Sequence, residues 1–166
     1  MKRCLPSILL LLAACGGAKP AAEPDAGNGP DLGPAIGVIA AKQQGPGDTL
    51  VVSGRVSKLV SGFAMFTIMD TALPYCGEHS LEDKCTTPWD YCCEKKETVA
   101  ANALLVEFRG ADGKPLPATR LGGLHLLDRV SIRGKLVQGE GGLVLVADEM
   151  SRTQRPQLPD YVKWPG

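Results

Sequence analysis

Residues 49–58 read TLVVSGRVSK, and residues 129–148 read RVSIRGKLVQGEGGLVLVAD. Apolar and polar residues alternate in both stretches, which is the pattern of a β-strand with one buried face. In the second stretch the residues QGEGG separate two such runs, and a short glycine-rich link of this kind indicates a β-hairpin. We therefore predict strands over residues 49–58, 129–137 and 143–148.

Two further runs, at residues 63–70 and 103–109, bring the predicted strands to five. Gly54 and Gly134 lie inside the first and the fourth of these strands. Glycine inside a strand permits the sharp bend by which a strand turns the corner of a small barrel. The sequence thus predicts an all-β fold in the form of a small five-stranded barrel. An open sandwich of the same strands is the alternative.

The runs VVSGRV and VSIRGKLV, the second of them after the step Leu127-Asp128, resemble exported bacterial domains of the OB-fold type. The resemblance implies a single OB-like barrel domain over residues 35–150. An OB-fold usually has a helix between its third and fourth strands, but residues 110–128 are rich in proline and glycine. A short helix over residues 36–42, which follows Pro34, is expected to cover the core instead.

The N-terminus resembles the signal peptide of a bacterial lipoprotein. Lys2 and Arg3 precede a short apolar run, and the run ends in the letters LAAC at residues 12–15. The resemblance implies a signal peptide over residues 1–14 and acyl chains such as palmitate on Cys15. An ordinary secretory signal that leaves Cys15 free is the alternative. Gly16 after the cysteine favours the outer membrane, so we expect a lipid-anchored protein of the cell envelope that faces the periplasm.

Residues 15–34 are mostly glycine, alanine, proline and acidic residues, and such a composition buries too little apolar surface to order itself. We therefore predict a flexible tether there, and an extended C-terminal strap over residues 151–166. Without Lys2 and Arg3 the chain keeps 16 basic residues against 18 acidic ones, a formal charge of −2. This balance does not favour nucleic acid as a partner. The expected partners are the membrane, through the anchor, and an envelope protein or small ligand, with the chain itself a monomer.

The four cysteines of the predicted domain all lie between its second and third strands. They are Cys76, Cys85, Cys92 and Cys93. An even number of cysteines in an oxidising compartment predicts two disulfides. A ring closed between adjacent cysteines seldom meets disulfide geometry, so Cys76 and Cys85 are each expected to pair with one of the other two. The letters TPWDYCC at residues 87–93 resemble a block of uncharacterised exported OB-like proteins, which implies no particular activity.

A metal site for zinc or copper(I) is the alternative role of these cysteines, with His79 as an additional ligand. Thiolate sulfur suits both ions, although the spacing lacks the paired C-x2-C of structural zinc sites. The absence of C-x-x-C disfavours a thioredoxin-like redox role. The prediction of two disulfides requires no cofactor.

A ligand-binding face on the barrel is a third hypothesis, since OB-folds bind oligonucleotides and oligosaccharides on such a surface. Its candidate residues are Arg55, Arg109, Arg133, Lys135, Trp89 and Tyr91. Aromatic residues in a loop more often pack it onto the barrel, and a basic sheet face is more often merely solvated. The sequence contains only two histidines, and it has neither a motif for a catalytic nucleophile nor a phosphate-binding motif. We therefore expect a non-enzymatic domain that is structural or ligand-binding.

Overall fold

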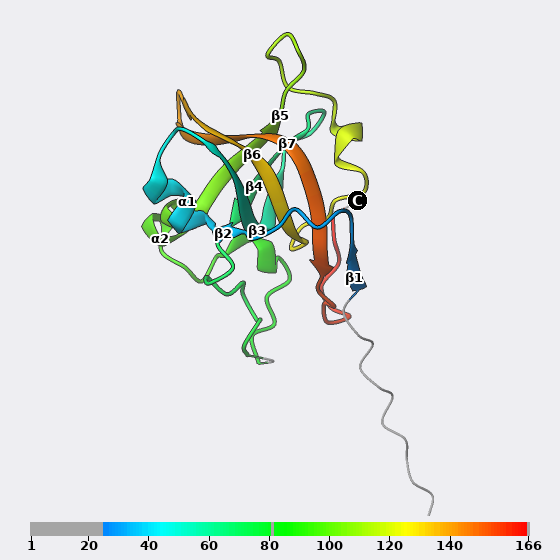
Figure 1. Ribbon diagram of the computed structural model, residues 1–166. Helices are drawn as coiled ribbons and strands as arrows, with labels where there is room; N and C mark the ends of the chain where they lie inside the picture. Colours follow the sequence, from blue (N-terminus) through cyan, green and yellow to red (C-terminus); the bar gives the residue numbers. More distant parts are fainter. Residues whose placement is uncertain (1–24, 81, 166) are drawn as a thin grey trace, which may run out of the picture.

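The computed structural model describes residues 25–80 and 82–165, and its main body is a closed five-stranded barrel (Figure 1). The barrel strands are β3 (Thr49–Leu59), β4 (Met65–Met69), β5 (Ala103–Phe108), β6 (Arg129–Gly139) and β7 (Gly142–Arg155). Around the barrel they follow the order β3-β4-β5-β7-β6, and β6 pairs with β3 to close the circuit. Among the neighbouring pairs of these five strands, only β5 and β7 run parallel. The predicted all-β, OB-like barrel is confirmed, and the closure excludes the open sandwich.

Alternate residues of the five strands point into the barrel and form its core, as the periodicity predicts. The fully buried strand residues include Val52, Val56, Phe66, Ile68, Val106, Val130, Ile132 and Leu145. Every strand contributes to this one cluster, so the barrel is a single cooperative unit.

Two glycines allow the strands to approach closely where the barrel turns. A Cβ atom on Gly54 would lie 2.9 Å from the side chain of Ile68. A Cβ atom on Gly134 would collide with the carbonyl oxygen of Val146, and the β6–β7 register shifts between Arg133 and Gly134. Both positions therefore require glycine, which is the corner role that the sequence predicts for them.

A short helix covers the core beside β3 and β5. Strand β2 (Ile36–Gly37) pairs in parallel with β3 and leads into α1 (Val38–Gln44), whose residues Val38 and Ala41 are fully buried. The side chain of Asp70, at the end of β4, accepts a hydrogen bond of 2.9 Å from the backbone N–H of Ile39. The predicted helix is thus present, although it begins two residues later because Ile36 and Gly37 join the sheet.

Residues 25–34 belong to the folded domain, which corrects the predicted tether. Strand β1 (Asp25–Asn28) pairs antiparallel with the last part of β7. Leu32 is buried, and its carbonyl oxygen accepts a hydrogen bond from Arg133. Strand pairing uses backbone groups, and so a composition poor in apolar residues does not exclude it. Residues 15–24 lie outside the described part of the chain, as does the predicted signal peptide.

The chain beyond the barrel returns to pack on it. Strand β7 continues to Arg155, so the barrel extends past the predicted boundary at residue 150. In the remaining strap Val162 is buried, and the indole N–H of Trp164 donates to the carbonyl oxygen of Leu126 at 2.9 Å. Within residues 25–80 and 82–165 no helix has the length and apolar character needed to cross a membrane.

The glycine corners lead to a prediction about stability. Gly134→Ala should lower the free energy of unfolding by about 3 kcal/mol, because the new methyl group meets backbone atoms that cannot move aside. Gly47→Ala is the matched control, since nothing lies within 4 Å of a Cβ atom there. Urea denaturation measures both variants. Equal stability of the two would contradict a close backbone approach at Gly134.

Candidate metal centre

The cysteine segment is a long loop between β4 and β5, as predicted, and it extends below the barrel in Figure 1, drawn in green. Its two ends are held together, because the backbone N–H of Asp70 donates to the carbonyl oxygen of Asn102 at 2.9 Å. Within the loop lie a 3-10 turn, η1 (Pro88–Asp90), and a helix, α2 (Lys96–Asn102). Helix α2 is an addition to the elements predicted from the sequence. The side chain of Lys42 in α1 donates to three carbonyl oxygens at the C-terminal end of α2, those of Ala100, Ala101 and Ala103.

A tight turn presents the two adjacent cysteines together. Tyr91 has a left-handed backbone conformation, with φ of 50°, and its carbonyl oxygen accepts a hydrogen bond of 2.9 Å from the backbone N–H of Glu94. Cys92 and Cys93 are the two central residues of this turn. Both side chains consequently reach the thiol of Cys76, which the sequence spacing alone does not suggest.

Three of the four thiols, those of Cys76, Cys92 and Cys93, converge in space, and the fourth, that of Cys85, contacts Cys92. The Sγ atom of Cys92 lies 3.7 Å from that of Cys76 and 3.7 Å from that of Cys85. The sulfurs of Cys76, Cys92 and Cys93 all lie within 4.8 Å of one another, and no disulfide joins any of the four. Zinc–sulfur bonds of about 2.3 Å in a tetrahedron place the sulfurs about 3.8 Å apart. The observed separations match those of a metal–thiolate site.

Mutual hydrogen bonding divides the thiols into one acidic group and two weakly acidic ones. Burial raises the pKa of Cys76, but hydrogen bonds from the Cys93 backbone and from the other three thiols outweigh it and leave this pKa below its ordinary value. Hydrogen bonds to Cys76 and Cys85 raise the pKa of Cys92 to about 12, and the hydrogen bond to Cys76 also raises the pKa of Cys93. Ionisation of Cys76 is thus favoured, whereas ionisation of Cys92 and Cys93 is opposed. A bound cation would favour the ionisation of these two thiols as well.

A buried ion pair fixes the segment that carries Cys76. Arg55, only 8% exposed, donates to the carbonyl oxygen of Leu73 at 3.0 Å and forms an ion pair of 2.6 Å with Glu78. The other carboxylate oxygen of Glu78 accepts a hydrogen bond from the backbone N–H of Tyr75. The guanidinium group also lies 5.3 Å from the centre of the Tyr75 ring. Arg55 was predicted for a ligand face, but the structure places it beneath the cysteine loop.

The two aromatic residues of the loop are buried rather than presented to solvent. Trp89 belongs to the hydrophobic core, and Tyr91 is 1% exposed. Burial raises the pKa of Tyr91 to about 12, and its hydroxyl group has no hydrogen-bond partner among the described residues. These residues pack the loop onto the barrel, and they also line a hollow of about 390 Å³ together with Lys58, Met69 and Val99.

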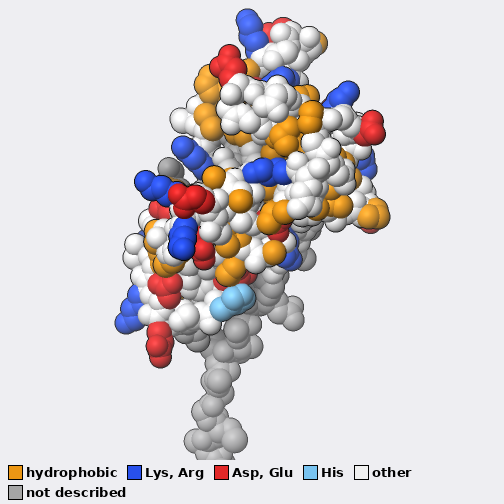
Figure 2. All heavy atoms as spheres, turned by 90° about the vertical axis from the view of Figure 1, so that its left-hand side faces the viewer, with side chains coloured by type: hydrophobic (Ala, Val, Ile, Leu, Met, Phe, Trp, Pro, Cys, Tyr) orange, Lys and Arg blue, Asp and Glu red, His pale blue; other side chains and the backbone are white. Residues whose placement is uncertain are grey.

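The remaining predicted basic residues do not form one charged face. Arg109 pairs with Glu107 at 2.7 Å, and Arg133 pairs with Glu149 at 2.8 Å. Lys135 is exposed on β6. Figure 2 shows Lys and Arg side chains interspersed with Asp and Glu on the face that carries α1 and α2. Compensated charge of this kind gives weak attraction to a polyanion.

His79 does not join the thiols. It is exposed on the loop and, like Cys85, lies outside the group of three cysteines whose sulfurs are all within 4.8 Å of one another. Cys85, however, contacts the sulfur of Cys92 at 3.7 Å, and no such contact is described for His79. A carboxylate oxygen of Asp83 lies 3.9 Å from the sulfur of Cys93. Tyr161 of the C-terminal strap donates to the backbone carbonyl oxygen of Asp83 at 3.2 Å, which ties this part of the loop to the domain.

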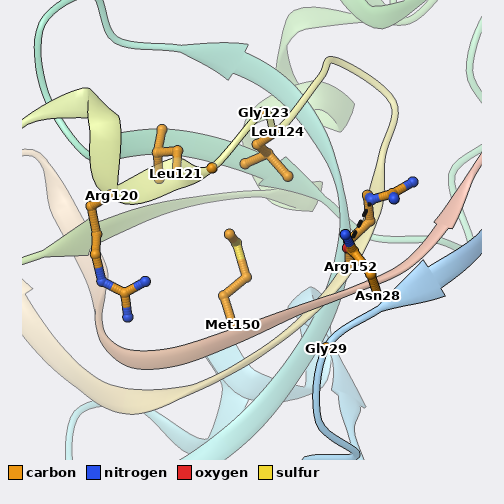
Figure 3. A pocket seen from close by; sticks show the side chains of 9 residues that line it. Asn28, Gly29, Arg120, Leu121, Gly123, Leu124, Met150 and Arg152 are labelled. Carbon is orange, nitrogen blue, oxygen red and sulfur yellow. Dashed lines mark hydrogen bonds between the residues drawn. The ribbon is translucent and has the colours of Figure 1, made fainter.

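Away from the thiols, a hollow lies between β1, β7 and the turn η2 (Ala118–Leu121), and Figure 3 shows the side chains around it. Its volume is about 320 Å³. It is lined by Asn28, Gly29, Arg120, Leu121, Gly122, Gly123, Leu124, Met150 and Arg152. Arg152 donates to the side-chain oxygen of Asn28 at 3.2 Å. None of the lining residues is a cysteine, histidine or carboxylate, so this pocket supplies neither metal ligands nor an acid–base pair.

The raised pKa values predict a pH-dependent metal affinity. Cys92, with its pKa of about 12, is protonated at neutral pH, so a metal must displace that proton when it binds. The affinity for zinc should therefore rise with pH, by up to about tenfold per pH unit for each proton released. Competition with a chelator of known affinity, repeated between about pH 6 and about pH 8, measures the slope. A zinc affinity that does not change with pH would exclude binding through thiolates.

Comparison with known proteins gives no relative, since no protein-family model, curated protein or solved structure matches this chain. A function must therefore be inferred from the chemistry of the converging thiols.

Proposed function

We propose that this protein is a lipid-anchored component of the bacterial cell envelope whose OB-like domain binds one soft metal ion. The ligands are the thiolates of Cys76, Cys85, Cys92 and Cys93, and the ion is zinc or copper(I). The observation that supports this most directly is the 3.7 Å separation of Cys92 from both Cys76 and Cys85. Sulfur ligands at this spacing suit both ions.

The role is binding rather than catalysis. A catalytic zinc site keeps one position open for water, whereas four thiolates would fill a tetrahedral ion. Cys92 and Cys93 are exposed and Cys76 is buried, so the ion would lie at the surface, where it can exchange with solvent or a partner. A bound ion would also cross-link the cysteine loop, which has few apolar side chains of its own to hold it in place.

The alternative is a purely structural domain whose loop is held by two disulfides. The same four cysteines would then be oxidised, and the loop would gain about 3 kcal/mol from the constraint on the unfolded chain. The 3.7 Å spacing of the sulfurs, which is close to that of a metal–thiolate site, favours the metal centre. The two hypotheses differ in whether a chelator or a reductant destabilises the protein.

The anchor belongs to the proposal through the LAAC motif at residues 12–15. The first described strand begins at Asp25, so nine residues, 16–24, separate the lipid-bearing cysteine from it. An extended chain of that length spans about 30 Å. The domain would thus be held close to the membrane surface, on the periplasmic side of the outer membrane.

The metal centre is tested by elemental analysis of the full-length protein after purification under reducing conditions. About one equivalent of zinc or copper per chain is expected, and a chelator should lower the melting temperature. Cys92→Ser should lose the ion, because Cys92 is the thiol that contacts both Cys76 and Cys85. His79→Ala is the control and should keep it. A wild-type protein that binds no metal while its thiols are reduced would refute the proposal.

The anchor is tested separately by metabolic labelling with palmitate. Cys15→Ser should abolish the label, because acylation requires the thiol of the first mature residue. Cys4→Ser removes a cysteine within the predicted signal peptide and should leave the label unchanged. Label that persists on the Cys15→Ser protein would show that Cys15 is not the lipidation site.

A further inference from the structure

We infer that the thiol cluster is a redox-gated metal site that releases its ion when Cys85 pairs with Cys92 and Cys76 pairs with Cys93. The inference rests on the proposed metal centre and adds its regulation. In the reduced state the four thiolates hold the ion. In the oxidised state the same sulfurs form two disulfides and can no longer bind it, because the thiolate is the metal ligand.

The positions of the thiols select this pairing among the three that four cysteines allow. Pairing Cys92 with Cys93 would require a strained ring between neighbours in the chain. Pairing Cys76 with Cys92 would leave Cys85 and Cys93. The contacts described for Cys85 are with Cys92 and Cys76, whereas Cys93 interacts with Cys76, Cys92 and Asp83. Of the two pairings that avoid the strained ring, only that of Cys85 with Cys92 and of Cys76 with Cys93 joins thiols that are already neighbours in both bonds.

Accessibility gives the order of events. Cys92 and Cys93 are exposed, Cys85 is partly exposed and Cys76 is buried. An external oxidant therefore reaches one of the two adjacent thiolates first. The less accessible cysteine of each pair then resolves the intermediate, which is the usual arrangement of an attacking and a resolving thiol.

The reaction is thiol–disulfide exchange with a small disulfide such as oxidised glutathione. The Cys92 thiolate attacks one sulfur of the disulfide, forms a mixed disulfide and expels one thiolate. The Cys85 thiolate then attacks Sγ of Cys92, forms the Cys85–Cys92 bond and expels the second thiolate. Each turn transfers two electrons from the protein to the reagent. A second molecule oxidises Cys93 and Cys76 in the same way, and the ion leaves with its oxidation state unchanged.

The fold allows both states without unfolding. The ends of the loop are joined by the bond between Asp70 and Asn102, and the Cys76 segment is held by Arg55 and Glu78. None of these contacts involves sulfur, and no cysteine belongs to the hydrophobic core cluster of the barrel. Exchange of the ion for two disulfides therefore changes the cross-link of the loop but not the barrel.

The test begins with full-length protein that is reduced and loaded with zinc, then titrated with oxidised glutathione. Zinc captured by a chromogenic chelator should reach one equivalent as two disulfides form, and the oxidised chain should be about 4 Da lighter than the reduced chain. Dithiothreitol followed by zinc should restore binding. Thiols that stay reduced and keep their zinc in excess oxidised glutathione would overturn the gate but leave the proposed metal centre standing.

A pair of double variants tests the connectivity, since each keeps two cysteines. Cys76→Ser with Cys93→Ser retains Cys85 and Cys92, and it should close an intramolecular disulfide readily. Cys76→Ser with Cys92→Ser retains Cys85 and Cys93, and it should close one at least tenfold more slowly. Equal rates would refute the proposed pairing. Failure of the reduced wild-type protein to bind zinc would instead refute the proposed function, and the gate with it.

Discussion

The close approach of backbones at Gly54 and Gly134 is the constraint on which the rest of the structure depends. Strand β3 pairs with β6 over its first half and with β4 over its second, and the two pairings meet at Arg55, which is opposite both Arg129 and Met69. A side chain at position 54 would press on Ile68. Without the two glycines the strands could not bend enough to close the circuit.

The same closure determines where the thiol cluster lies. Because Arg55 follows Gly54 at the point where β3 passes from one neighbour to the other, its guanidinium group lies beneath the loop that follows β4. There it holds Glu78 and the Cys76 segment, while Asp70 connects the start of the loop to α1. A charge buried on the barrel wall would be costly by itself, and the ion pair with Glu78 offsets that cost. Barrel geometry and the candidate metal site are thus physically linked.

The sequence predicted the five barrel strands well, because alternation of apolar and polar residues is a local property of each strand. Four of them begin within two residues of their expected positions and end within two, and β7 alone runs seven residues further. Strand β1 and helix α2 were missed for a shared reason. Strand β1 is held in place by its pairing with β7, and α2 is held by hydrogen bonds from Lys42. Neither element therefore shows a recognisable pattern in its own residues.

The sequence by itself determined the barrel, its glycine corners, the place of the cysteines between the second and third barrel strands, and the resemblance of the N-terminus to a lipoprotein signal peptide. These properties depend on residue type and on short spacings along the chain. Only the tertiary structure decided that Cys76, Cys92 and Cys93 converge with Cys85 against Cys92. It also decided that His79 lies apart from them and that Arg55 serves the loop instead of a ligand face. The turn at Tyr91 and the ion pair of Arg55 with Glu78 direct the path of the loop, which brings the thiols of Cys76 and Cys93 together. Such a path depends on contacts between residues that are distant in the sequence.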